Sequence, residues 1–568
     1  MRLGLHSTDN QEATPWSMSK YWNFLGSNYQ KLVLLGIPLL YLLTSVFFIL
    51  YNSNWTFGDD AIFLETLAVG KPIQSFYSPD SGRFFPLAFL EYNPLGFDAH
   101  PARYYLWQAF KFSGLVIFFW YFLNTIIQGC FPTLPLLLRN TVLSLAICFL
   151  ISAKSIFLIY ANLIYSESSI LILLTLFLIF YFKAILGNKR KTLHLLIAFA
   201  FANLSFYFKE PVLGAVLATI CVPLLFQSVR DKINVPLLLS LSFLSAVTYF
   251  SLYYSFVWSE HTDDFYNTDR VANYSVFLFF KTLAKNHPLL LFSFAFGLFR
   301  IIDIAYRSVL LKQKVSTNLI LFDGLLHSGN LYVLAYCFLK LVEGYYFTIS
   351  YIFILPSIVF YIFYYLKEVD LLSIQIVFKK ARIVHLSVLS FPLIFLLFAS
   401  TVFHTFTSYR NEIKTSIELR SKQFSGLKSI LPDLKNDLYC LVPNEAILND
   451  PFQKTLISYT YLTLTKDLEF LSGDSLDVKL YHPNQTGSTS NYVQQHFLEK
   501  DNRKVPSYST IIANKDDAVG IVVVKGYIKF LPAFLKSYNY IDGANMFLPF
   551  DFYLPNSENS IYNLKEIQ

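Results

Sequence analysis

The stretch that decides the fold class is "LVLLGIPLLYLLTSVFFILYNSNWTFGDDAIFLETLAVGKP", residues 32–72. Its first part, 32–51, carries no charged side chain and is long enough to cross a bilayer as a helix. Residues 1–20 are polar for too long to be a signal peptide, so we expect this helix to remain in the protein. Just past the membrane edge stand two adjacent carboxylates, Asp59 and Asp60, which contribute nothing to a hydrophobic core and therefore need another explanation.

The composition indicates that membrane segments recur along the whole chain and are not confined to residues 32–51. Of 568 residues, 54% are hydrophobic, 18% aromatic and only 15% charged, and the mean hydropathy is +0.45. A soluble protein carries nearer a quarter of charged residues, so the composition predicts a polytopic membrane protein. The net charge of +7 belongs to connecting loops and does not indicate nucleic acid. The five cysteines form no CxxC pair, so neither a disulfide framework nor a zinc site is predicted.

Apolar segments of about spanning length recur as far as residue 402 and predict a mainly α protein with about eleven membrane helices. Two of the segments are short and joined by "FKEP", which predicts a helical hairpin. The predicted helices lie near 32–51, 104–127, 137–153, 166–186, 193–208, 211–228, 236–257, 287–303, 318–341, 346–366 and 383–403.

The basic residues predict how the chain is oriented in the membrane. Four clusters fall on alternate connections, and the positive-inside rule places them in the cytoplasm together with the N-terminus. They are "GNKRKT" (187–192), "RDK" (230–232), "RSVLLKQK" (307–314) and "KKAR" (379–382). The remaining connections then face outward, namely 52–103, a short link near 154–165, 209–211, 258–286 and 343–346.

The character of the chain changes after His404. Polar sequence is followed by short β-like segments at 438–443, 478–483 and 520–526. We therefore expect a transmembrane domain over residues 1–403 and a small soluble α/β domain over 404–568. The odd number of helices places this second domain outside the cytoplasm.

The first outer connection is too long for a simple linker. Residues 59–69 have a broad apolar surface, which predicts a helix lying on the membrane, with Asp59 and Asp60 in its first turn. The helix dipole favours a carboxylate there, so capping explains one aspartate but not the adjacent second one. The other interpretation is that one of them deprotonates a hydroxyl at the membrane surface. A second surface segment, "SGRFFPLAFLEYNPLGF", carries Arg83 and Glu91 to the same interface.

These motifs, in this order and on one side of the membrane, resemble the GT-C superfamily of membrane glycosyltransferases. The resemblance covers the chain to about residue 403 and rests on "GDDAIFLETLAVG" (58–70), "GRFFPL" (82–87), "YFKEP" (207–211) and "EGYYF" (343–347). It implies transfer of a hexosyl or pentosyl group from a polyprenyl-phosphate donor to a hydroxyl of a glycan, lipid or protein on the outer face. Asp59 or Asp60 would be the general base. The resemblance implies no certain cofactor, and a divalent cation is left open.

The same resemblance suggests roles for further residues, each with a structural alternative. Lys209 would bind the donor phosphate, whereas the alternative is a local Lys209–Glu210 pair with the lysine reaching the headgroups. Arg83 would contact phosphate or anchor the interface. Glu167 would be a second acid or cap the start of a helix.

Tyr345 and Tyr346 are the last two candidates. They would line the pocket for the lipid phosphate or the sugar, or belong to an ordinary interfacial aromatic belt.

One acidic outer loop carries residue types that bind metal ions in other proteins. "WSEHTDDFYNTDR" (258–270) gathers four carboxylates and His261, which are suitable ligands. The spacing fits no defined site, and a solvated loop is the preferred interpretation, so no metal-binding residue is predicted.

Two other functions remain as alternatives to the transferase. A transporter or flippase of lipid-linked saccharides would carry charged residues inside its helices, whereas here charges concentrate outside them, with Arg139 and Asp323 as exceptions. An O-antigen-type ligase or polymerase would have its large outer loop late in the chain. For all three we expect a multi-pass protein of the bacterial inner membrane, in contact with membrane lipid and not with nucleic acid.

Overall fold

The computed structural model describes most of the first 368 residues and five later strands. The described ranges are 18–51, 53, 72–78, 83–96, 102–132, 136–187, 189–260, 275–310, 312, 314–341, 344–368, 438–441, 478–481, 520–524, 538–541 and 550–555. The predicted surface helix 59–69 and the predicted helix 383–403 lie outside these ranges, so both stay predictions.

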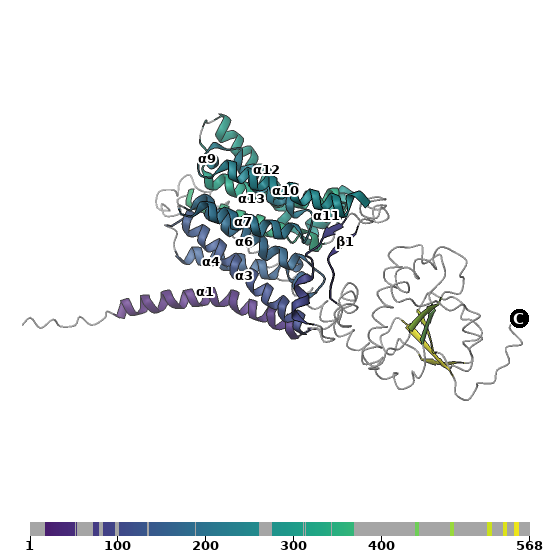
Figure 1. Ribbon diagram of the computed structural model, residues 1–568. Coiled ribbons are helices and arrows are strands. Elements are labelled where there is room, and N and C mark those ends of the chain that lie inside the picture. The colour runs from purple at the N-terminus through teal and green to yellow at the C-terminus, as the bar shows by residue number, and fades with distance from the viewer. Residues whose placement is uncertain are drawn as a thin grey trace, which may run out of the picture.

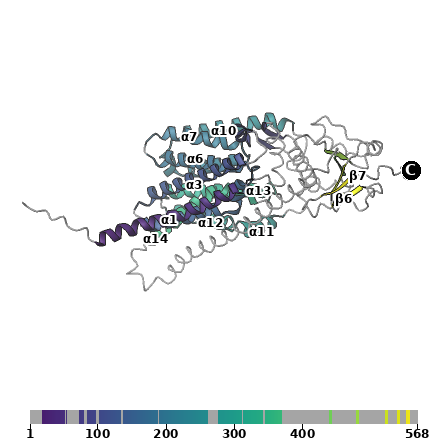
Figure 2. The same ribbon diagram turned by 90° about the horizontal axis from the view of Figure 1, so that it is seen from below.

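The first part of the chain is a bundle of helices (Figures 1 and 2). Its α-helices are α1 (Met18–Tyr51), α3 (Ala102–Cys130), α4 (Leu136–Ser152), α5 (Lys154–Ala161), α6 (Glu167–Leu186), α7 (Lys191–Phe206), α8 (Val212–Leu224), α9 (Gln227–Arg230), α10 (Val235–Phe256), α11 (Val276–Asn286), α12 (Pro288–Ala305), α13 (Thr317–Phe338) and α14 (Ser350–Glu368). Short 3-10 helices are η1 (Leu90–Leu95), η2 (Trp258–Glu260) and η5 (Gly344–Phe347), and η4 (Tyr306–Leu310) is a π-helix.

Ten of the eleven predicted helices coincide with helices of the structure. The predicted hairpin around "FKEP" is formed by α7 and α8. Among the described residues, two α-helices lie in expected connections: α5 occupies the short link near 154–165, and α11 lies within the connection 258–286.

Five of the described helices are long and apolar enough to cross a membrane, by length and composition. They are Ala102–Cys130, Glu167–Leu186, Val235–Phe256, Pro288–Leu310 and Thr317–Phe338. Residues 139–152 and 155–161 form a pair bent by 55°, which makes a sixth span if counted as one. Four further apolar helices are shorter. The chain is therefore built as an integral membrane protein, while the predicted number of about eleven spans is not reached by this criterion within the described ranges.

The helices pack in an order that brings distant segments together. Helix α6 lies against α3 and α7, and α13 lies against α8 and α14. Figure 1 shows α1 along one side of the bundle, where it contacts α3 and α4, with α10 and α12 on the opposite side. In Figure 2 the α7, α6 and α3 helices follow one another across the bundle. The start of α6, the α7–α8 turn and η5 meet at one end, which we name the outer end after the predicted orientation.

Helix α13 approaches its two neighbours closely because it carries glycine at the contacts. A Cβ on Gly324 would lie 2.7 Å from Pro223 Cγ of α8, and a Cβ on Gly329 would lie 2.5 Å from Ile354 Cγ1 of α14. Small residues of this kind allow membrane helices to pack backbone to backbone.

The strands form two sheets. Strands β1 (Phe76–Ser78) and β2 (Arg83–Phe85) make an antiparallel hairpin, with Ser78 opposite Arg83. The later strands β3 (Leu438–Leu441), β4 (Val478–Tyr481), β5 (Gly520–Val524), β6 (Tyr538–Ile541) and β7 (Phe550–Pro555) form one sheet in the order β4-β3-β5-β7-β6. Both β3 pairings are parallel, and β7 is antiparallel to both of its neighbours. The three predicted β-like segments contain β3, β4 and β5, while the division of the chain into two domains stays a prediction.

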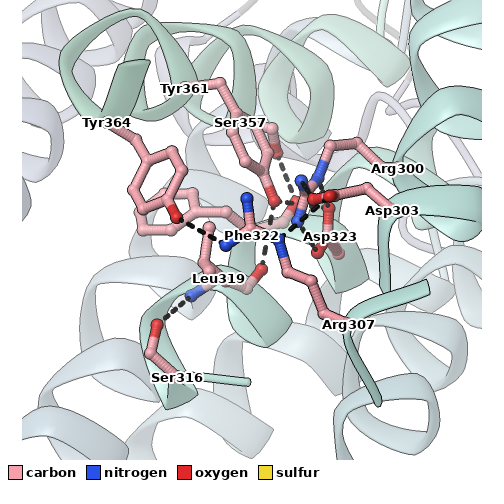
Figure 3. A network of polar contacts seen from close by, with 10 residues as sticks. All are labelled: Arg300, Asp303, Arg307, Ser316, Leu319, Phe322, Asp323, Ser357, Tyr361 and Tyr364. Carbon is pink, nitrogen blue, oxygen red and sulfur yellow. Dashed lines mark hydrogen bonds and ion pairs between the residues drawn. The ribbon is translucent and has the colours of Figure 1, made fainter. Parts of the chain in front are cut away.

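A buried network of charges joins α12, α13 and α14 (Figure 3). It includes Asp323 near the start of α13, whose far end leads to η5 at the outer end. Arg300 is fully buried and donates from Nε and Nη2 to the two carboxylate oxygens of Asp323, at 2.9 and 3.0 Å. It also pairs with Asp303, which accepts from Arg307 Nε at 2.9 Å. The guanidinium lies 4.6 Å from the ring centroid of Tyr361, whose hydroxyl donates to Asp323.

This network qualifies one expectation from the sequence. Charges were expected mainly outside the helices, with Arg139 and Asp323 as exceptions, but Arg300, Asp303 and the buried Lys111 of α3 also lie in helices. Each of these three is paired with an opposite charge, which lowers the cost of placing it in a membrane protein.

Candidate functional site

The candidate site lies at the outer end, where the α7–α8 turn carries Lys209 and Glu210. The turn is short because Pro211 cannot continue α7, and its ring begins α8 instead. Backbone and side-chain bonds hold the turn to its neighbours: Leu87 N–H donates to Tyr207 O at 3.1 Å, and Ser166 Oγ donates to Phe208 O at 3.2 Å. Segments from three distant parts of the sequence therefore meet around the two ionisable residues.

Lys209 forms an ion pair with Glu167, at the first position of α6. Both side chains are largely buried, with exposed fractions of 14% for Lys209 and 2% for Glu167. The local Lys209–Glu210 pair, which was the structural alternative from the sequence, is therefore wrong. Glu167 lies where the α6 dipole favours an anion, so its carboxylate is stabilised both by the helix and by the lysine.

Three tyrosine rings surround the Lys209 ammonium. Its Nζ lies 4.6 Å from the ring centroid of Tyr346, 5.5 Å from that of Tyr345 and 5.9 Å from that of Tyr336. These are cation–π distances, and they hold the ammonium in a partly dry environment without neutralising it. Tyr346 is only 5% exposed, so it is not part of an aromatic belt at the membrane surface. Tyr336 was missed by the sequence analysis because it lies inside an apolar helix.

The turn that carries the two candidate tyrosines is supported by His287. His287 is buried between α11 and α12, and its Nδ1 lies 3.0 Å from Tyr351 Oη of α14. Its ring meets Phe347 of η5 at 5.4 Å between centroids. Gly344 begins η5 directly against this imidazole, and a Cβ there would lie 2.9 Å from His287 Nε2. The position of η5 is thus set by a tight contact that tolerates only glycine without a shift.

Glu210 faces the β-hairpin rather than Lys209. Its Oε1 accepts a hydrogen bond of 2.6 Å from the Phe84 N–H. Burial raises the pKa of Glu210, and this effect exceeds the lowering by the Phe84 hydrogen bond and by the charges of Arg83 and Lys209. Arg83, at the start of β2, therefore lies near enough to act on the carboxylate electrostatically. The structure brings Arg83, Glu167, Lys209, Glu210, Tyr345 and Tyr346 to one end of the bundle.

Asp59 and Asp60 lie outside the described residues, so the general base stays a prediction. Within the described part of the chain no group of three or more His, Cys, Asp or Glu side chains could hold a metal ion, and most of the acidic loop 258–270 lies outside it.

No family model matches the chain, and no curated protein matches it. The chain is similar to a solved structure described as the crystal structure of ArnT from Cupriavidus metallidurans bound to undecaprenyl phosphate, with a TM-score of 0.46, 11% identity and coverage of 92% of this chain and 99% of that one. A crystal structure of the same protein in the apo state gives a TM-score of 0.34 and 10% identity over 89% of this chain and 98% of that one. At this similarity the comparison by itself decides neither family nor activity.

Proposed function

We propose that the chain is a membrane glycosyltransferase of the GT-C type. It moves a hexosyl or pentosyl group from a polyprenyl-phosphate donor to a hydroxyl of a glycan, lipid or protein at the outer face. The proposal rests on the motifs named above, and the observation that carries it is the environment of Lys209. A partly buried ammonium, fixed by a carboxylate and three rings at the end of a membrane bundle, is suited to bind a phosphate carried by a lipid.

Lys209 has the donors for this role. An ammonium has three N–H donors, and Glu167 accepts one of them, so the others are able to reach phosphate oxygens. The neighbouring Arg83 offers a guanidinium, whose planar fork fits phosphate in a bidentate manner. Fixed cations at this position stabilise the charge that develops on the phosphate as it leaves the sugar.

The reaction that follows is a single substitution at the anomeric carbon. The acceptor oxygen forms a bond to that carbon, the bond from the carbon to the phosphate oxygen breaks, and the bonding electrons leave with the polyprenyl phosphate. The proton of the acceptor hydroxyl goes to a carboxylate, for which Asp59 or Asp60 is proposed. A phosphate is already a good leaving group, so the reaction needs no strong acid.

One observation supports the alternative of a transporter or flippase. The Arg300–Asp323 pair and its partners place charges between helices, as transport pathways often do. Against this, Arg300 makes closed ion pairs with both aspartates. The transferase therefore remains the preferred function, and a ligase or polymerase acting on the same face differs from it only in donor and acceptor.

The test uses the full-length protein in lipid nanodiscs. It is supplied with polyprenyl-phosphate hexoses and pentoses and with lipids and glycans extracted from cells that lack the gene. We expect one donor to be consumed, with release of polyprenyl phosphate and a new glycosylated product seen by mass spectrometry. Lys209→Met should raise the donor KM at least about tenfold, because it removes a charged contact to phosphate.

The matched control is Lys285→Met, which removes an exposed lysine of α11 and should leave the donor KM unchanged. No turnover of any donor by the wild-type protein, or an unchanged donor KM in Lys209→Met, would contradict the proposal. Movement of labelled lipid-linked saccharide between leaflets without bond cleavage would establish the transporter instead.

A further inference from the structure

Lys111 of α3 is a buried lysine that none of the sequence motifs includes. Its side chain is 4% exposed, and its Nζ donates to Ser168 Oγ at 2.7 Å and to Ser169 Oγ at 3.3 Å. The same nitrogen pairs with Glu91 Oε1 at 3.3 Å and lies 5.3 Å from the ring centroid of Tyr92. One ammonium therefore binds the first turn of α6 and the helix η1.

Glu91 of η1 contacts both Lys111 and the first turn of α6. Its Oε1 accepts from Ser169 Oγ at 2.7 Å as well as from Lys111. The three elements α3, α6 and η1 are thus joined by a triangle of charge-assisted hydrogen bonds, which are stronger than bonds between neutral groups. A buried lysine is costly in a membrane helix, and such residues usually serve a function.

Each of the two elements that Lys111 joins is directly connected to a part of the candidate site. Ser168 follows Glu167, the residue that pairs with Lys209. Helix η1 follows β2, whose Phe84 N–H binds Glu210. A shift of α6 relative to η1 would therefore displace Glu167 from Lys209 on one side and Glu210 from the hairpin on the other.

We propose that Lys111, together with Glu91, is a positioning residue for the Lys209 phosphate-binding site. The pair holds the first turn of α6 against η1, so that the Glu167 carboxylate meets the Lys209 ammonium. Lys111 does not touch the substrate and acts through Ser168, Ser169 and Glu167. The part of this inference that concerns phosphate rests on the proposed function, whereas the positioning itself does not.

The experiment removes the pair without leaving a buried charge. In the double variant Lys111→Met/Glu91→Gln, and in Ser168→Ala/Ser169→Ala, the donor KM should rise roughly ten- to hundredfold, because a small displacement of a binding group has effects of that size. The acceptor KM should stay within about twofold of the wild-type value. A merely structural role would lower the amount of active protein, and so the apparent kcat, with an unchanged donor KM.

A second readout is independent of activity. Amide hydrogen exchange should become faster at 166–170 and 207–211 in both double variants. The control is Lys183→Met, which removes a lysine in the last turn of α6, where its Nζ lies 5.0 Å from the ring centroid of Tyr121. This variant should change neither the donor KM nor the hydrogen exchange at the two segments. Unchanged exchange at both segments would overturn the inference whatever the activity. An absence of turnover in the wild-type protein would instead contradict the proposed function and leave the exchange result to decide on Lys111.

Discussion

Lys209 pairs with Glu167, which lies 42 positions earlier in the chain, and not with Glu210, which is its neighbour in sequence. Because Lys209 is directed toward α6, Glu210 is left to bind the Phe84 N–H of the hairpin. The two adjacent ionisable residues of the α7–α8 turn thus hold two different parts of the chain. Several consequences of this arrangement are open to measurement.

The first prediction concerns Glu167→Gln. Removing one member of a buried ion pair leaves the other charge unpaired, which costs about 3–5 kcal/mol in the low-dielectric interior. We expect a lower midpoint of thermal unfolding and a donor KM raised at least about tenfold, because Lys209 is no longer held in place. Differential scanning fluorimetry and transfer kinetics in nanodiscs measure the two effects. The exposed Asp231→Asn is the control, and equal behaviour of the two variants would contradict a structural role for the pair.

The second prediction is a pH dependence caused by Glu210. Burial raises the pKa of this carboxyl in the folded protein above its ordinary value of 4.5. The folded state therefore binds the proton more tightly than the unfolded state, and the stability that this group contributes is complete below pH 4.5. This contribution is lost as the pH rises through the raised pKa.

Glu210→Gln tests this because an amide does not titrate. The stability of the variant should fall less than that of the wild-type protein as the pH rises from 4.5 through the raised pKa. Thermal unfolding at several pH values measures the difference between the two proteins. Parallel curves for both would show that Glu210 is not the titrating group.

The third prediction concerns Gly344→Ala. The added methyl would lie 2.9 Å from His287 Nε2, and the imidazole is held by its contact with Tyr351 Oη, so η5 must shift. Overpacking of this kind costs about 1–3 kcal/mol, and the shift moves Tyr345 and Tyr346 away from Lys209. We expect lower stability and a transfer rate reduced about tenfold.

Gly214→Ala in α8 is the matched control, since no atom lies within 4 Å of its added Cβ. Its stability and activity should match or slightly exceed those of the wild-type protein, because alanine favours the helix. If Gly344→Ala behaved in the same way, the contact with His287 would not determine the position of η5.

The sequence was sufficient for the positions of most helices because apolar length is a local property. The helix predicted at 166–186, for example, corresponds to α6 (Glu167–Leu186), with almost the same first and last residues. The partner of Lys209 could not be read in this way, because it depends on how α6 packs beside the α7–α8 turn. Tyr336 was missed for a similar reason: a tyrosine in an apolar helix gives no sign of the direction in which its ring points. Lys111 and Arg300 were detectable omissions, since a charged residue within a predicted spanning segment is itself a signal.

The fourth prediction concerns the Arg300 network (Figure 3). Arg300→Met leaves Asp323 buried without its charge partner, so the variant should lose about 3–5 kcal/mol of stability. The double variant Arg300→Met/Asp323→Asn removes both charges and should recover part of that loss. The donor KM should be unchanged in both variants because the network lies away from the outer end. A double variant no more stable than the single one would show that Arg300 acts through Asp303 instead.

The last prediction concerns Asp59 and Asp60, whose place in the fold is still a prediction. If one of them is the general base, Asp59→Asn or Asp60→Asn should reduce kcat by about 10²- to 10⁴-fold while the donor KM changes little, because the loss falls on proton transfer and not on phosphate binding. The other aspartate, if it only caps a helix, should cost about 1 kcal/mol of stability with nearly full activity. Glu65→Gln, a further carboxylate of the same segment, is the control. Full activity of both asparagine variants would show that neither Asp59 nor Asp60 is the general base. The role of Lys209 would still be decided by the Lys209→Met experiment.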